Sequence, residues 1–122
     1  MIRFPPPVVA AVNGPAVGLG CSLALGCDLV LMADDAHLAD PHISVGLVAG
    51  DGGVTLWPLL TSLLRMKEYL FTGDRIPAAT AVQLGLARHK GGAGRGDGAG
   101  DPGRHPVSVP AGSVTAAALP PP

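Results

Sequence analysis

Apolar residues form short runs, separated by breaks rich in glycine and proline, along the first 89 residues of the chain. The runs Val8–Val12 and 28–33 have the length of strands, and the turn residues beside them favour buried strands. The break at 13–18 lies between these runs and predicts a helix that begins near Gly20 and carries residues 22–25. The order strand, helix, strand favours an α/β fold.

The later part of this region predicts two extended segments followed by three helices. Residues 37–39 are expected to be extended, and so are residues 43–48, with a bend at Gly46. The helices are predicted over 54–64, 65–71 and 78–84. Thr72-Gly73 and Gly85 mark the ends of the last two helices.

The composition changes at Lys90. The segment 90–122 is roughly two-fifths glycine and proline without a period, which predicts a low-complexity disordered tail. Consecutive prolines make 1–7 an extended lead-in. The chain is therefore expected to hold one domain over 8–89, between these two flanking segments.

Charge and composition exclude several classes of function. A net charge of −1 provides no attraction to nucleic acid or to an anionic membrane. Prolines and Asn13-Gly14 interrupt the uncharged stretch 4–27 too often for a transmembrane helix. Cys21 and Cys27 lack zinc or disulfide spacing and are expected to be buried, and the histidines show no metal-ligand pattern. We expect no metal and a cytoplasmic location.

The glycine-rich turn around Gly18, Leu19 and Gly20 is the most informative feature of the sequence. Its backbone N–H groups would lie at a helix N-terminus, where unpaired donors favour an anion or a developing oxyanion. A tight turn that binds nothing is the simple alternative. A Rossmann-like dinucleotide site is another, with the pair 34–35 as the ribose-binding acids, although too many residues separate the strand from the first glycine.

Several consecutive motifs resemble the central part of the crotonase (enoyl-CoA hydratase/isomerase) superfamily. They are AAVNGPAVGLGCSLALGCDLVLMADDAHLADPHISVGL, GDGGV, LLRMKEYLFTGDRI and AVQLGLA, and they extend from Pro7 to about His89. The resemblance implies a ββα spiral truncated at its N-terminus and a trimer or dimer of trimers. It also implies an acyl-CoA thioester substrate, with coenzyme A as part of that substrate and no other cofactor.

The resemblance also implies roles for individual residues. The backbone N–H of Leu19, where the family usually has glycine, would be one donor of an oxyanion hole whose second donor lies upstream. The implied substrate-binding positions are Pro15, Gly18, Leu19, Gly20, Pro41, His42, Leu47, Ala49 and Gly50.

Ser22 and His42 occupy the positions of the two glutamates of the family's hydratases. Asp51 lies near the aspartate of several isomerases. Because both glutamates are replaced, an isomerase-type or an unknown reaction is expected in preference to hydration. Ser22 could instead pack, His42 could be a loop histidine, and Asp51 could cap a helix. A catalytically inactive truncated paralogue is the alternative for the whole chain. Four further aspartates are attributed to solvated turns, namely Asp34, Asp35, Asp40 and Asp74.

Overall fold

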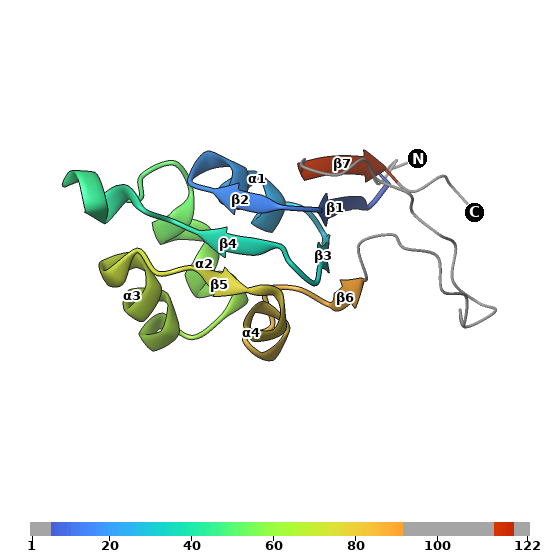
Figure 1. Cartoon of the computed structure of the whole chain (residues 1–122). Coiled ribbons are helices and arrows are strands. Elements are labelled where there is room, and N and C mark those ends of the chain that lie inside the picture. Colours follow the sequence, from blue (N-terminus) through green and yellow to red (C-terminus); the bar gives the residue numbers. More distant parts are fainter. Residues whose placement is uncertain (1–5, 92–113, 119–122) are drawn as a thin grey trace, which may run out of the picture.

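A computed structural model describes residues 6–91 and 114–118 of the chain (Figure 1). These residues form two small sheets and four α-helices, which confirms the predicted α/β class. Among the described helices, none combines the length and the apolar character that crossing a membrane requires. The second sheet positions the site, because β2 leads into α1 and β4 leads toward η1.

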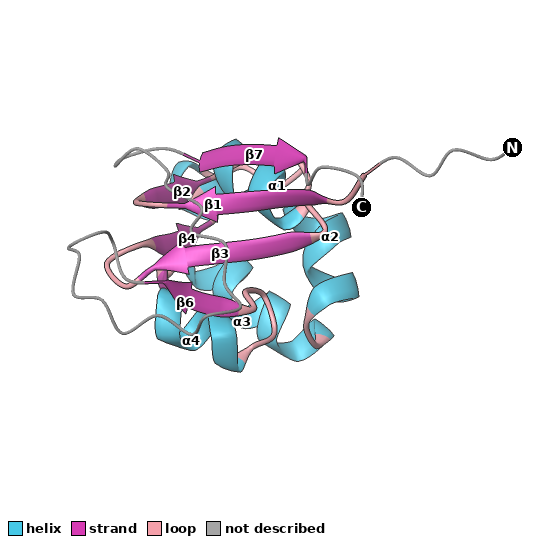
Figure 2. Cartoon of the chain, turned by 90° about the vertical axis from the view of Figure 1, so that its right-hand side faces the viewer, coloured by secondary structure: helices cyan, strands magenta, loops and turns pink. Residues whose placement is uncertain are grey.

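The first sheet has the strand order β6-β3-β1-β7 (Figure 2). Strand β1 (Val8–Val12) pairs in parallel with β3 (Leu29–Ala33), with Val9 opposite Leu29. Strand β6 (His89–Gly91) extends the sheet beyond β3. The predicted strand at 8–12 is confirmed, and the strand predicted at 28–33 begins one residue later.

Strand β7 (Val114–Ala118) pairs antiparallel with β1 at the other edge of this sheet. The prediction that the whole tail is disordered is therefore wrong for these residues. The glycine and proline content of 90–122 as a whole predicts disorder. The run 114–118, however, contains only β-branched residues and alanine, and it pairs with the edge of β1. The remaining tail residues, 92–113 and 119–122, lie outside the described residues.

The second sheet has the order β2-β4-β5. Strand β2 (Pro15–Val17) pairs in parallel with β4 (His37–Ala39), and β4 pairs antiparallel with β5 (Ile76–Pro77). The extended segment 37–39 is confirmed. The sequence did not predict β2, which was read as part of the turn before the helix. The Asn13-Gly14 break lets the chain leave one sheet and enter the other within two residues.

The helices are α1 (Leu19–Leu25), α2 (Gly53–Leu60), α3 (Leu63–Thr72) and α4 (Ala78–Gln83). The boundary between α2 and α3 differs from the predicted one at residue 64. Thr61 is extended, and the hydroxyl of Ser62 caps α3 by accepting from the Arg65 amide at 3.3 Å. Gly73 ends α3 in the left-handed region at φ 71°, as the sequence predicted.

The expectation of an extended segment over 43–48 is wrong. Residues His42–Val45 form a 3₁₀ helix, η1, which Gly46 ends at φ 74°. The amides of Ser44 and Leu47 donate to the carbonyls of Pro41 and His42, both at 2.9 Å. The apolar residues of this segment are exposed rather than paired in a sheet, so local hydrogen bonds decide its conformation.

Small aliphatic side chains and one tryptophan form the core between the sheets and the helices. Trp57 of α2 is fully buried, as are Val12 of β1 and Leu38 of β4. Cys21 is buried as predicted, whereas Cys27 is only partly buried. This core holds the start of α1, the end of β4 and the start of α2 together, and the candidate site lies where they meet.

Candidate functional site

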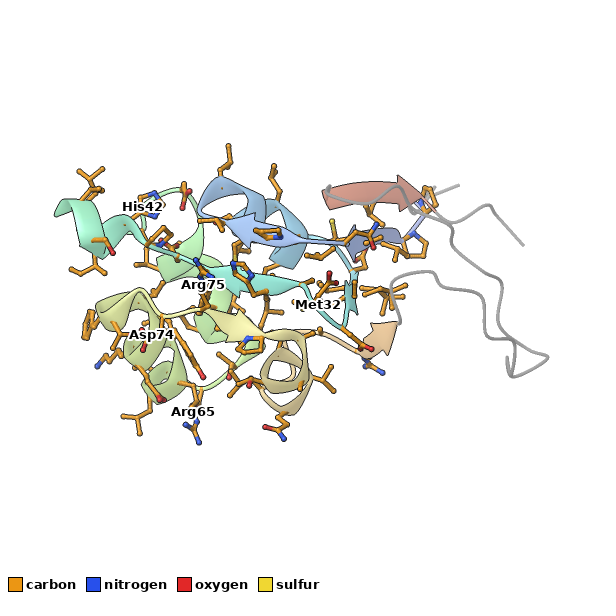
Figure 3. All side chains as sticks on the ribbon, viewed as in Figure 1. Met32, His42, Arg65, Asp74 and Arg75 are labelled. Carbon is orange, nitrogen blue, oxygen red and sulfur yellow. The ribbon has the colours of Figure 1, made fainter. Side chains whose placement is uncertain are left out.

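The site is formed by four polar residues from three parts of the chain. Asp40 and His42 follow β4, Ser22 lies on α1, and Asp51 lies in the turn before α2. Figure 3 shows His42 where β4 meets η1, at the end of the molecule opposite the four-stranded sheet that contains Met32. The structure therefore brings together three predicted site residues that are up to 29 positions apart in the sequence.

Asp40 and His42 form the first pair of residues in the site. The side chain of Asp40 is 1% exposed, and that of His42 is 24% exposed. Oδ1 of Asp40 accepts a hydrogen bond from Nδ1 of His42 and a longer one, 3.4 Å, from the His42 backbone amide. Because an ionised carboxylate can only accept, this contact assigns the proton to Nδ1.

Asp51 and Ser22 form the second pair of residues in the site. Oδ2 of Asp51 lies 3.6 Å from Nε2 of His42, and Oγ of Ser22 donates to Oδ1 of Asp51 at 3.4 Å. Ser22 is itself buried. The four side chains thus form a continuous polar row from Ser22 through Asp51 and His42 to Asp40.

The Leu19 amide lies beside this row. Leu19 is the first residue of α1, and no hydrogen-bond acceptor for its N–H occurs among the described residues. Gly18 precedes it at φ 56°, and a side chain at Gly18 would begin 3.7 Å from Cε1 of His42. The main chain at Gly18, immediately before this open donor, therefore lies next to the imidazole, and the Leu19 side chain is exposed rather than packed.

Two glycines allow the turn before α2 to approach the row. At Gly52, φ is 137°, and a Cβ there would lie 3.0 Å from both Cβ and Oγ of Ser22. At Gly53 a Cβ would lie 2.5 Å from Oδ2 of Asp40 and 2.9 Å from Cβ of Ala49. The absence of side chains here is what lets α2 begin against the buried carboxylate.

This contact predicts that Gly53→Ala lowers the free energy of unfolding by about 1–3 kcal/mol, because the new methyl group overpacks a fully enclosed space. Gly20→Ala is the matched control, since Gly20 is also helical and a Cβ there meets nothing within 4 Å. Denaturant unfolding of both variants tests this. Equal stability of the two variants would contradict the packing described at Gly53.

The remaining predicted substrate-binding positions differ in how exposed they are to solvent. Ala49 is buried, whereas Pro15, Leu47 and Gly50 are exposed, and Pro41 and Gly20 are intermediate. The Gly50 amide donates to the Val48 carbonyl at 2.7 Å. These positions remain predictions as contacts for a ligand.

Two groups in the site have shifted pKa values. The hydrogen bond to the Asp40 carboxylate raises the pKa of His42 above its ordinary value of 6.5, against a smaller opposing effect of desolvation. Burial raises the pKa of the Cys21 thiol to about 12, so Cys21 remains a neutral thiol beside the carboxylates. His42 is therefore the cationic partner available to Asp51.

Asp40, His42 and Asp51 are also the group of described residues that could hold a metal ion, because their ligand atoms lie within 4.8 Å of one another. The direct bond between Nδ1 of His42 and Asp40 already uses one pair of these atoms. Oδ2 of Asp40 lies against Gly53, so Nε2 of His42 and the Asp51 carboxylate are the groups that face each other across the site, fewer than the three or four protein ligands of a typical zinc site. The arrangement suits proton exchange better.

Asp40 is the site residue that the sequence analysis missed. It was assigned to a solvated turn because it precedes Pro41, but it is buried and bonded to His42. The spacing Asp-Pro-His carried a usable signal, because the carboxylate of an aspartate can accept from the backbone and side chain two residues later.

The fold places the chain among the crotonase-type α/β proteins. Residues 1–89 match the model of the enoyl-CoA hydratase/isomerase family, and the chain belongs to that family. A crystal structure of an enoyl-CoA hydratase/isomerase from Mycobacterium paratuberculosis is 65% identical, with a TM-score of 0.68 over 70% of this chain and 34% of that one.

Two relatives align over a similar share of this chain, at lower sequence identity. The crotonyl-CoA hydratase of Syntrophomonas wolfei is 41% identical over 66% of this chain and 31% of its own length. The mitochondrial enoyl-CoA hydratase of Pongo abelii is 42% identical over 66% of this chain and 28% of its own length. The chain thus spans about a third of the length of these relatives.

The dinucleotide-binding alternative is wrong. In a Rossmann unit the first strand leads almost directly into the glycine turn and a crossover helix. Here β2 intervenes and pairs in a second sheet, and α1 has only seven residues. Family membership supports the same conclusion.

Proposed function

We propose that this chain contributes to proton transfer on an acyl-CoA thioester through an enolate, in the manner of an isomerase rather than a hydratase. The single observation that carries the proposal is the unpaired Leu19 amide beside the His42–Asp51 pair. An enolate forms when a base removes an α-proton while donors stabilise the negative oxygen, and both requirements meet at this point.

The Leu19 N–H would receive the thioester oxygen. It lies at the start of α1, where the helix has unpaired donors and a partial positive charge. Gly18 provides access, because its missing side chain leaves the main chain open beside His42. As the charge on oxygen grows during proton removal, this donor stabilises the transition state more than the bound thioester.

Asp51 and His42 would move the proton. Asp51 takes a proton from the α-carbon, and the electrons of that C–H bond pass into the dienolate. Protonated His42 then donates its Nε2 proton to the γ-carbon, and Asp51 returns its proton to Nε2 across the 3.6 Å that separates them. The substrate leaves with its double bond moved, and both residues regain their starting states.

Hydration is the weaker reading of the same site. It requires an acid and a base that flank an attacking water, and the two positions of the hydratase glutamates carry Ser22 and His42. A serine hydroxyl does not titrate near neutral pH, and Ser22 donates to Asp51. Ser22 therefore serves as a partner of Asp51. Asp51 and His42 remain as the adjacent pair that can remove a proton from the substrate and return it.

The proposal is tested by incubating the protein with butanoyl-CoA in deuterated water and following loss of the α-proton signals by NMR. We expect deuterium to enter the α-position faster than in buffer alone and without net consumption of the thioester. No exchange above the buffer rate would overturn the proposal and favour the catalytically inactive paralogue.

A further inference from the structure

We propose that Asp40 is a positioning residue whose carboxylate holds Nδ1 of His42 and thereby makes Nε2 the atom through which His42 exchanges protons with Asp51. This inference rests on the proposed function for its catalytic meaning, but its structural part can be tested without any thioester.

The burial of Asp40 is the first observation behind it. An aspartate next to a proline normally caps a turn in contact with water, yet this side chain is 1% exposed. Burying a carboxylate without a partner is strongly unfavourable, because the charged group loses its hydration and gains nothing in return. The buried carboxylate of Asp40 therefore needs a specific partner, and the His42 imidazole is that partner.

The second oxygen of Asp40 indicates how its charge is held. Oδ2 is buried and has no hydrogen-bond partner among the described residues. It lies against Gly53, the first residue of the eight-residue helix α2. The partial positive charge at the start of a helix is a favourable surrounding for a carboxylate oxygen there.

Two hydrogen bonds distinguish positioning from simple turn capping. A capping role needs only the bond from the His42 backbone amide to Oδ1, which is 3.4 Å long. The additional bond from Nδ1 fixes the ring of a side chain that is 24% exposed and would otherwise rotate. With Nδ1 occupied, the other ring nitrogen faces Asp51.

The charged groups that act on the His42 imidazole are Asp40 and Asp51. From α1, the neighbouring side chains are the neutral Ser22 hydroxyl and the neutral Cys21 thiol. Gly73, which follows α3, lies against Ile43 and Ser44 of η1, and none of these three residues carries a charge. A change at Asp40 therefore removes one of two negative charges around the ring.

The test is an imidazole ¹H–¹⁵N correlation spectrum of the protein recorded over a range of pH. His42 is assigned as the signal lost in His42→Gln, among the four histidines of the chain. We expect a titration midpoint above 6.5, and a neutral form in which Nδ1 carries the proton. A neutral form protonated at Nε2 would overturn the inference, and this result needs no variant of Asp40.

Asp40→Asn and Asp35→Asn provide the matched comparison. Both remove one negative charge, but Asp35 is exposed in the turn between β3 and β4. Since the Asp40 charge favours the protonated ring, we expect Asp40→Asn to lower the His42 midpoint and Asp35→Asn to leave it unchanged. Equal midpoints in the two variants would contradict the role of Asp40.

The α-proton exchange of butanoyl-CoA then distinguishes positioning from packing. In Asp40→Asn, we expect the part of the pH profile due to His42 to move to lower pH together with the NMR midpoint. A lower rate at every pH with an unmoved profile would mean that Asp40 serves packing alone. The expected imidazole spectrum without any thioester exchange in the wild type would overturn the proposed function and leave the placement of His42 intact.

Discussion

Asp51→Asn is expected to lower the rate of α-proton exchange about 10²–10⁴-fold, the range that general base catalysis contributes. Asparagine keeps the size of the side chain and can still accept from Ser22, but it cannot take up a proton near neutral pH. The measurement is deuterium incorporation into butanoyl-CoA at saturating thioester, so that a change in binding does not enter the rate.

Asp74→Asn is the control for this prediction. It makes the same change of charge at an exposed residue in the loop after α3. Unfolding free energies of the two variants show whether either has lost its fold. If Asp51→Asn exchanged protons as fast as Asp74→Asn, Asp51 would have no part in the reaction. The helix-cap alternative does not apply, because Gly52 is the N-cap of α2 and no side chain caps that helix.

Leu19→Pro is expected to lower the same rate about 10²–10³-fold, the loss that follows removal of one oxyanion-hole donor. Proline lacks an N–H, and the first position of a helix tolerates it well because that N–H has no partner within the helix. Gly18 before it is not in the helical region, so the restriction that proline places on its predecessor is met.

Leu19→Ala separates the amide from the side chain. Alanine removes the exposed leucine side chain and keeps the N–H, so we expect exchange close to that of the wild type. Circular dichroism shows whether α1 is retained in both variants. A proline variant that keeps its helix and the full rate would remove the Leu19 amide from the mechanism.

Turn chemistry explains why much of the fold could be predicted from the sequence. Strands β1 and β4 and the start of α1 are bounded by glycine, proline or asparagine signals, and their positions are confirmed. The predictions that failed depended on whether another strand was available for pairing. The apolar run 43–48 has the pattern of a strand, but it pairs with no strand in the described part of the chain, and residues 42–45 form the local helix η1 instead.

The candidate site was only partly predictable for a related reason. Ser22, His42 and Asp51 were selected from the family resemblance, but their distances depend on how α1, β4 and α2 pack. Gly52 and Gly53 allow α2 to contact Ser22 and Asp40, and no local sequence pattern predicts this contact. The burial of Asp40 likewise follows from the packing of α2 and not from the residues beside it in the sequence.

The central claim is that the Leu19 amide receives the oxygen of a thioester. The most direct measurement is a ¹H–¹⁵N correlation spectrum of the protein during titration with acetoacetyl-CoA, whose enolate carries part of its negative charge on that oxygen. We predict a progressive downfield shift of the Leu19 amide proton, larger than that of any other amide in α1. A Leu19 resonance that stays in place at saturating ligand would contradict the account.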